Sequence, residues 1–160
     1  MRRRTLVAGG VLAGAAALLE SRAEAADATI ARRFADALTA HDLDAFAALF
    51  ADGYVNHQAS AAAPPSPGVT PKAATVAFYA ARLKALPDLK VSIETTVAEA
   101  DKVAASFVYE GTQEGPYYGI EPTGKRIRFT SCDIFRVADG KILEHWGMGD
   151  IAGIVAQLRG

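Results

Sequence analysis

The sequence predicts a single α+β domain in which N-terminal helices pack on one face of a curved antiparallel sheet. Apolar residues recur every three or four positions before Pro87 and about every second position after it, which are the periods of amphipathic helices and half-buried strands. The loops within the two expected hairpins are too short for the crossover that parallel strands require, so the sheet should be antiparallel. Helices followed by a meander of strands are typical of an α+β domain.

Helices are expected at 27–40, 43–50, 71–86 and 151–158. Asp42, Thr70 and Asp150 each stand just before one of them, where a side-chain oxygen can accept a hydrogen bond from a free backbone N–H of the first turn. Pro71 suits the first helical position, and Pro87 ends the third helix. Capping is therefore the expected role of Asp150.

Strands are expected at 89–98, 102–110, 125–137 and 141–148, after a short extended stretch at 54–58. The loops 99–101 and 138–140 join hairpins, whereas the longer connection 111–124 can overhang a cavity.

The last hairpin predicts a polar pair inside the domain. A three-residue loop at 138–140 places Asp133 opposite His145, on the sheet face that carries Phe129 and Phe135. An ionised carboxylate among apolar side chains is costly without a partner, so His145 is the expected partner of Asp133. A two-residue loop would instead pair Asp133 with Trp146, and this alternative stays open.

Composition excludes several classes of function. The 160 residues carry 17 Lys+Arg and 18 Asp+Glu without a basic run, so no nucleic acid partner is expected. The single cysteine, Cys132, excludes an internal disulfide and a multi-cysteine metal site. No spacing such as His-x-x-x-His supports a metal site, so neither metal nor cofactor is expected.

The first 25 residues have the pattern of a signal peptide. Three arginines at positions 2–4 precede an apolar run over 6–19, and Ala23-Glu24-Ala25 supplies a small-x-small cleavage site. Adjacent arginines before a weakly hydrophobic run resemble a twin-arginine signal. The run is shorter than the roughly 17–25 residues that span a bilayer. We therefore expect a signal peptide over 1–25, a domain over 26–160, export to the periplasm or the outside, and no stable membrane insertion after cleavage.

Five motifs follow one another along the chain. They are DGYVNH at 52–57, LPDL at 86–89, GTQEG at 111–115, GIEPTGK at 119–125 and IFRVADGKILEHW at 134–146. In this order they resemble the SnoaL-like polyketide cyclases and ester cyclases of the nuclear-transport-factor-2-like superfamily, over essentially all of 27–160. The resemblance implies a cone-shaped α+β barrel with a deep apolar pocket, in a homo-oligomer that is most often a dimer.

The resemblance also implies a chemistry. Characterised cyclases of this family close a ring by an intramolecular aldol reaction without metal or organic cofactor, using an aspartate assisted by a histidine on the neighbouring strand. In this chain Asp133 occupies the family's histidine position and Gly147 its aspartate position, while Asn56 and His145 are retained. Gln113 stands where many relatives have a histidine.

Two hypotheses of function follow. In the first, Asp133 and His145 form an acid–base pair for aldol cyclisation, isomerisation or dehydration of a small apolar carbonyl compound. In the second, the chain has lost the reaction with the aspartate at position 147 and binds or carries a small apolar ligand. The substrate-binding candidates are Asn56, His57, Tyr117, Tyr118, Phe129 and Phe135.

Overall fold

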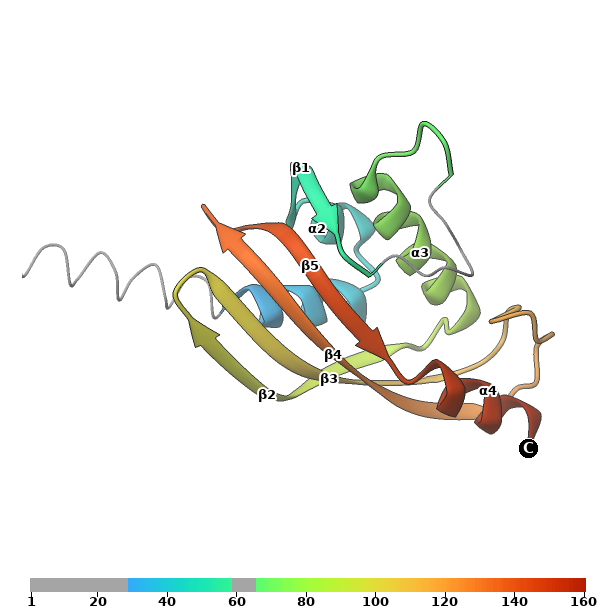
Figure 1. Cartoon of the computed structure of the whole chain (residues 1–160). Helices are drawn as coiled ribbons and strands as arrows, with labels where there is room; N and C mark the ends of the chain where they lie inside the picture. The colour runs from blue at the N-terminus through green and yellow to red at the C-terminus, as the bar shows by residue number, and fades with distance from the viewer. Residues whose placement is uncertain (1–28, 59–65) are drawn as a thin grey trace, which may run out of the picture.

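A computed structural model describes residues 29–58 and 66–160 of the chain (Figure 1). The predicted signal peptide and its cleavage site lie outside the described residues. Within the part described, no helix is both long and apolar enough to cross a membrane.

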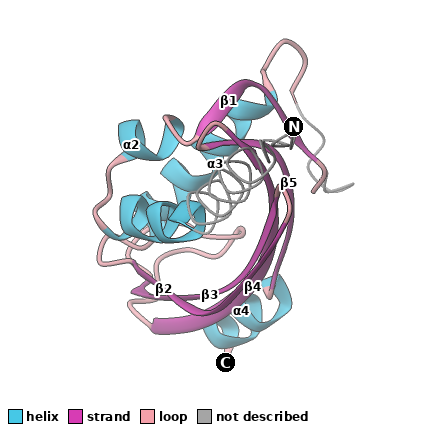
Figure 2. Ribbon diagram, turned by 90° about the vertical axis from the view of Figure 1, so that its left-hand side faces the viewer, coloured by secondary structure: helices cyan, strands magenta, loops and turns pink. Residues whose placement is uncertain are grey.

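The fold class predicted from the sequence is confirmed: helices pack against a curved five-stranded sheet. A helix at 29–39 precedes α2 (Leu43–Ala47), β1 (Phe50–Asn56), α3 (Pro71–Ala85), β2 (Lys90–Glu99), β3 (Lys102–Thr112), β4 (Arg126–Ala138), β5 (Lys141–Gly149) and α4 (Ile151–Arg159). The strand order is β1-β5-β4-β3-β2. Figure 2 shows the sheet bending around α3, with α2 on the same inner side.

The sheet is mixed rather than purely antiparallel, which corrects one detail of the prediction. The strands β2 to β5 pair antiparallel as expected, but β1 pairs parallel to β5, with Asn56 beside His145. Loop length restricts only strands that follow one another in the chain, and β1 is separated from β5 by all the intervening elements. The second helix is also shorter than predicted, because Phe50 already begins β1.

The three predicted helix caps are confirmed. The side chains of Asp42, Thr70 and Asp150 accept hydrogen bonds from the backbone N–H three residues later, at 2.8, 3.2 and 2.8 Å. Each bond satisfies a backbone donor that the helix itself leaves free.

The hairpin between β4 and β5 has neither of the two predicted registers. Asp139 and Gly140 have φ values of 51° and 68°, which form a two-residue turn of type I′, and a bulge at Leu143 follows it. Asp133 therefore lies opposite Gly147, and Phe135 lies opposite His145. The register differs from the three-residue-loop prediction by two residues, and a shift of two keeps every side chain on its predicted face.

The core fills the space between the helices and the inner face of the sheet. Phe34, at the centre of the first helix, has its ring 5.1–5.3 Å from those of Phe46, Phe107 and Phe135. Beyond the end of β5, the helix α4 lies beside β4. The side chain of Gln157 accepts a hydrogen bond from the backbone N–H of Arg128 and donates one to its carbonyl oxygen. The core and α4 thus fix β4 on both sides, and β4 carries Asp133.

Candidate functional site

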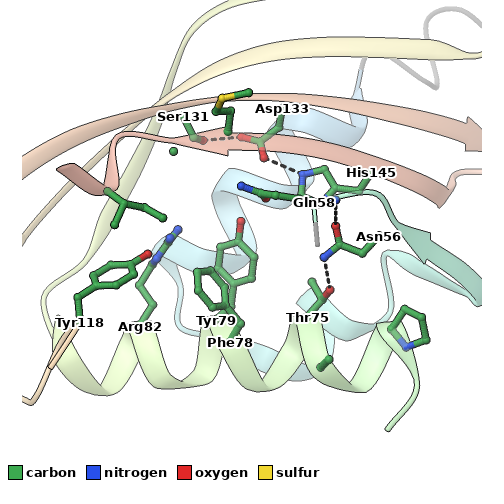
Figure 3. A pocket seen from close by; sticks show the side chains of 15 residues that line it. Asn56, Gln58, Thr75, Phe78, Tyr79, Arg82, Tyr118, Ser131, Asp133 and His145 are labelled. Carbon is green, nitrogen blue, oxygen red and sulfur yellow. Dashed lines mark hydrogen bonds and ion pairs between the residues drawn. The ribbon is translucent and has the colours of Figure 1, made fainter. Parts of the chain in front are cut away.

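A cavity of about 320 Å³ opens between α3 and the inner faces of β4 and β5 (Figure 3). Thr75, Tyr79 and Arg82 point into it from α3, and Ser131, Asp133 and His145 face them from the sheet. Most of the remaining lining is apolar. The volume lies at the small end of the roughly 300–1,000 Å³ that is usual for small-molecule sites.

Asp133 and His145 form a buried pair at the sheet side of the cavity. Each is 2% exposed, and the distance between His145 Nε2 and Asp133 Oδ1 is 2.7 Å. The hydroxyl of Ser131 donates a hydrogen bond to the other carboxylate oxygen, Oδ2. Both carboxyl oxygens of Asp133 therefore have a polar neighbour, and the carboxyl group stands at the wall of a mostly apolar cavity, within reach of a bound molecule, as a general base must.

A chain of hydrogen bonds runs behind His145. The Tyr54 hydroxyl lies 3.2 Å from His145 Nδ1, Thr75 donates to Tyr54 at 3.4 Å, and Asn56 donates to Thr75 at 3.4 Å. Burial raises the pKa of Tyr54 to about 12. The hydrogen bond from Thr75 lowers this pKa somewhat, and the negative charge of Asp133 raises it further. Because Tyr54 stays protonated and already accepts from Thr75, its proton points to Nδ1. This assigns the proton of a neutral His145 to Nε2, where it is donated to Asp133.

Gly147 is the directly paired neighbour of Asp133 and leaves room for this pair. A Cβ at position 147 would lie 2.5 Å from Asp133 Oδ1, 2.7 Å from His145 Nε2 and 2.7 Å from Gln58 Oε1. Any side chain at position 147 would therefore displace the Asp133–His145 contact. An acid at position 133 that meets His145 in this way therefore requires a glycine opposite it on β5.

Arg82 is the cation of the cavity lining. It is 7% exposed, and its Nε donates to the Tyr117 hydroxyl at 2.9 Å. Its guanidinium carbon lies 4.8–5.3 Å from the ring centroids of Phe78, Tyr79, Tyr109 and Phe129. Tyr117 and the four aromatic rings thus hold the guanidinium beside the cavity.

Of the predicted site residues, four line the cavity, three lie behind its lining, and His57 lies outside it. Asp133, His145, Asn56 and Tyr118 line the cavity. Tyr117, Phe129 and Phe135 lie behind the lining: Tyr117 and Phe129 contact Arg82, and the ring of Phe135 lies 5.0 Å from that of His145.

His57 lies outside the cavity lining. Its ring stacks on Trp146 at 4.3 Å, and its Nε2 lies 2.7 Å from Glu144 Oε2. His57 alternates with Asn56 along the chain, so only one of the two can face the cavity.

Gln113 has a structural role in the connection between β3 and β4. Its side chain is fully buried and makes five hydrogen bonds within the loop 115–123. Three go to the carbonyls of Gly115, Ile120 and Glu121, and two come from Thr123. These bonds shape the loop from which Tyr118 enters the cavity, so the predicted overhang is confirmed.

Sequence reasoning missed several lining residues, chiefly Gln58, Thr75, Arg82 and Ser131. Ser131 was detectable, because it precedes Asp133 by two positions and so shares its face. Arg82 gave no such signal, since an arginine in an amphipathic helix is ordinarily solvated. Among the described residues, no group of three or more histidine, cysteine or acidic side chains is placed to hold a metal ion.

Comparison with known proteins identifies a family and several similar structures. The family model described as SnoaL-like polyketide cyclase matches residues 28–158. The chain belongs to this SnoaL-like family. No curated protein matches it significantly. Among solved structures, AclR of Streptomyces galilaeus, described as a candidate hydroxylase, is 26% identical with a TM-score of 0.73, over 85% of this chain and 97% of AclR.

Two further solved structures are similar to the same extent. TsrD of Streptomyces laurentii is 26% identical with a TM-score of 0.71, over 84% of this chain and 95% of TsrD. IdmH of Streptomyces antibioticus, described as a candidate polyketide cyclase, is 26% identical with a TM-score of 0.70, over 84% of this chain and 99% of IdmH. A SnoaL-like fold is thus shared with one protein described as a candidate polyketide cyclase and another described as a candidate hydroxylase.

Proposed function

We propose that this SnoaL-like protein catalyses acid–base chemistry on a small carbonyl compound, without a cofactor, with Asp133 as the general base. The observation that carries the proposal is the buried Asp133–His145 pair, at 2.7 Å, on the wall of an otherwise mostly apolar cavity. Aldol cyclisation, isomerisation and dehydration share the same first step, removal of a proton from the carbon next to a carbonyl group.

The proposed reaction conserves its proton. The Asp133 carboxylate takes the proton from the α-carbon, and the carbon's electron pair forms an enolate. In an aldol closure, the enolate carbon forms a bond to a second carbonyl carbon of the same molecule, and the resulting alkoxide takes the proton back from Asp133. His145 donates its Nε2–H to Asp133 Oδ1 throughout the reaction and so orients the carboxylate. The other oxygen, Oδ2, accepts from Ser131 and has a second lone pair that can take the substrate proton.

Deuterium exchange tests the first step without knowledge of the natural substrate. We expect the protein to accelerate exchange of the α-protons of 4-phenylbutan-2-one in D2O, measured by proton NMR. Asp133→Asn should reduce this acceleration by about 100-fold or more, a loss typical of removing a general base. Asp139→Asn is the matched control, because Asp139 lies in the exposed β4–β5 turn, where asparagine is equally suited.

A non-catalytic binding protein is the second candidate, favoured by the glycine at the family's aspartate position. It predicts that 4-phenylbutan-2-one binds, that its NMR signals broaden or shift, and that its α-protons exchange no faster than in buffer. Exchange that is equally fast in Asp133→Asn and in the wild type would refute the role proposed for Asp133.

We also propose that residues 1–25 direct export by a twin-arginine route. The arginines at 2–4, the short apolar run and the Ala-Glu-Ala site support this. Fusion of residues 1–25 to a reporter should deliver it across the membrane in folded form, and replacing the arginines by lysines should retain it in the cytoplasm. Delivery that is unaffected by the lysine variant would contradict the twin-arginine route.

We further propose a homodimer in solution. Ile134, in the middle of β4, and Met148, at the end of β5 beside the cavity, are 38% and 76% exposed, which is high for large apolar side chains. Light scattering coupled to size exclusion should give twice the chain mass, and a monomer at micromolar concentration would refute this.

A further inference from the structure

Arg82 is a buried cation without an acidic partner among the described residues. None of the acidic side chains there forms an ion pair with it, and its one hydrogen bond goes from Nε to the neutral hydroxyl of Tyr117. An arginine stays protonated under all ordinary conditions. Removing such a positive charge from water costs free energy unless a negatively charged group compensates it.

The aromatic rings compensate the charge only in part. Phe78, Tyr79, Tyr109 and Phe129 offer their rings at 4.8–5.3 Å, and each such cation–π contact is worth roughly 0.5–2 kcal/mol. The rings hold the guanidinium in place but give no acceptor to its two Nη groups. Arg82 lines the cavity, and Figure 3 shows the nitrogen end of its side chain reaching from α3 toward the sheet.

The position of Arg82 relative to Asp133 gives the cavity two chemically distinct walls. Figure 3 shows Arg82 reaching in from α3 while Asp133 and His145 face it from the sheet. The Asp133 carboxylate is already bonded to His145 and Ser131. The hydroxyls of Tyr79 and Tyr109 feel both charges, since the negative charge of Asp133 and the positive charge of Arg82 act on their pKa values in opposite directions.

We propose that the ligand of this cavity is a carboxylic acid, bound with its carboxylate on the Nη groups of Arg82 and its apolar body among the aromatic rings. A planar guanidinium fork matches a carboxylate with two parallel hydrogen bonds, and Tyr118 borders the same space. The inference rests on the proposed function in one respect: repulsion from Asp133 keeps the ligand's acid end at Arg82, so that the ligand's carbonyl group faces Asp133. The substrate class is then a small oxo-carboxylic acid.

Binding of two matched probes tests the inference. The probes are 3-phenylpropanoate and 3-phenylpropanamide, which differ only in the charge of the terminal group. We expect the wild type to bind the carboxylate about 10- to 100-fold more tightly than the amide by isothermal titration calorimetry, the range expected for hydrogen bonds to a charged group. Equal affinities, or no binding of either probe, would overturn the proposal.

Variants locate the preference. Arg82→Met keeps an unbranched apolar stem among the rings and should abolish the preference, whereas Arg82→Lys keeps the charge without the fork and should retain part of it. Arg126→Met, which removes a side chain that is 63% exposed, is the control and should change nothing. A preference that survives Arg82→Met, or one lost in Arg126→Met, would place the anion elsewhere. If Arg82→Met does not fold, the Arg82→Lys comparison and the wild-type ratio still decide.

The proposed function and this inference fail separately. Asp133→Asn should stop α-proton exchange, while the preference for the carboxylate probe over the amide persists or increases, because a negative charge has been removed from the cavity. Exchange without a carboxylate preference would overturn the Arg82 inference alone, and a carboxylate preference without exchange would overturn the proposed catalysis alone.

Discussion

Replacing Gly147 by alanine should break the Asp133–His145 pair. The added Cβ would lie 2.5 Å from Asp133 Oδ1 and 2.7 Å from His145 Nε2, well inside van der Waals contact. The atoms that it meets are side-chain ends, but those of Asp133 and His145 are only 4% and 3% exposed, so they can move only by giving up their mutual contact. The substitution therefore acts on the pair before it acts on the backbone.

The free energy of unfolding should fall by at least about 2 kcal/mol, because the cost of overpacking and the loss of the hydrogen bond add at least in part. Overpacking a buried site costs about 1–3 kcal/mol, and a hydrogen bond to a charged group contributes about 1.5–3 kcal/mol. Urea unfolding followed by circular dichroism measures the change. The control is Gly53→Ala, where a Cβ meets nothing within 4 Å, and which should be neutral or stabilising by up to about 1 kcal/mol.

A double-mutant cycle separates this mechanism from a general loss of packing. In an Asp133→Ala background, the nearest obstacle to the new Cβ is gone and His145 has lost the partner that holds it, so Gly147→Ala should cost clearly less than it does in the wild type. The reasoning is refuted if Gly147→Ala costs no more than Gly53→Ala, or if its cost is unchanged when Asp133 is absent.

Three more predictions follow from the same structure. Burial raises the pKa of Tyr54, Tyr109 and Tyr117 to about 12, so the unfolded chain loses these protons near pH 10 and the folded chain does not. The contribution of these groups to stability should be constant below pH 10, and urea midpoints should fall between pH 10 and 12; midpoints that stay flat over that alkaline range would contradict this. Gln113→Ala should lower the free energy of unfolding by about 2–4 kcal/mol and make the loop 115–123 sensitive to limited proteolysis. A loop that stays as resistant to protease as in the wild type would argue against a structural role for these five hydrogen bonds. His57→Ala should change the affinity for 3-phenylpropanoate less than about twofold, because its ring stacks on Trp146 outside the cavity; a tenfold loss would return His57 to the site.

The fold and one side of the site were predictable because they depend on local periods. The change from a helical to an alternating pattern at Pro87 indicated the α+β class, and the three capping residues marked the helix starts. Alternation alone put Asp133 and His145 on one face. That prediction survived a wrong register, since the type I′ turn and the bulge at Leu143 together shift the pairing by an even number of residues.

The opposite wall of the cavity was decided by tertiary structure. The sequence by itself determined which side chains share a face of the sheet, because side-chain direction in a strand follows from position. It did not determine that β1 would lie parallel to β5 and bring Tyr54 to His145, or that α3 would turn Arg82 inward among four aromatic rings. These contacts join segments distant in the chain, and they depend on how the helices pack into the curve of the sheet. The strand pattern alone determines which face of the sheet carries Asp133, whereas only the packing of α3 against the sheet determines that Arg82 faces it.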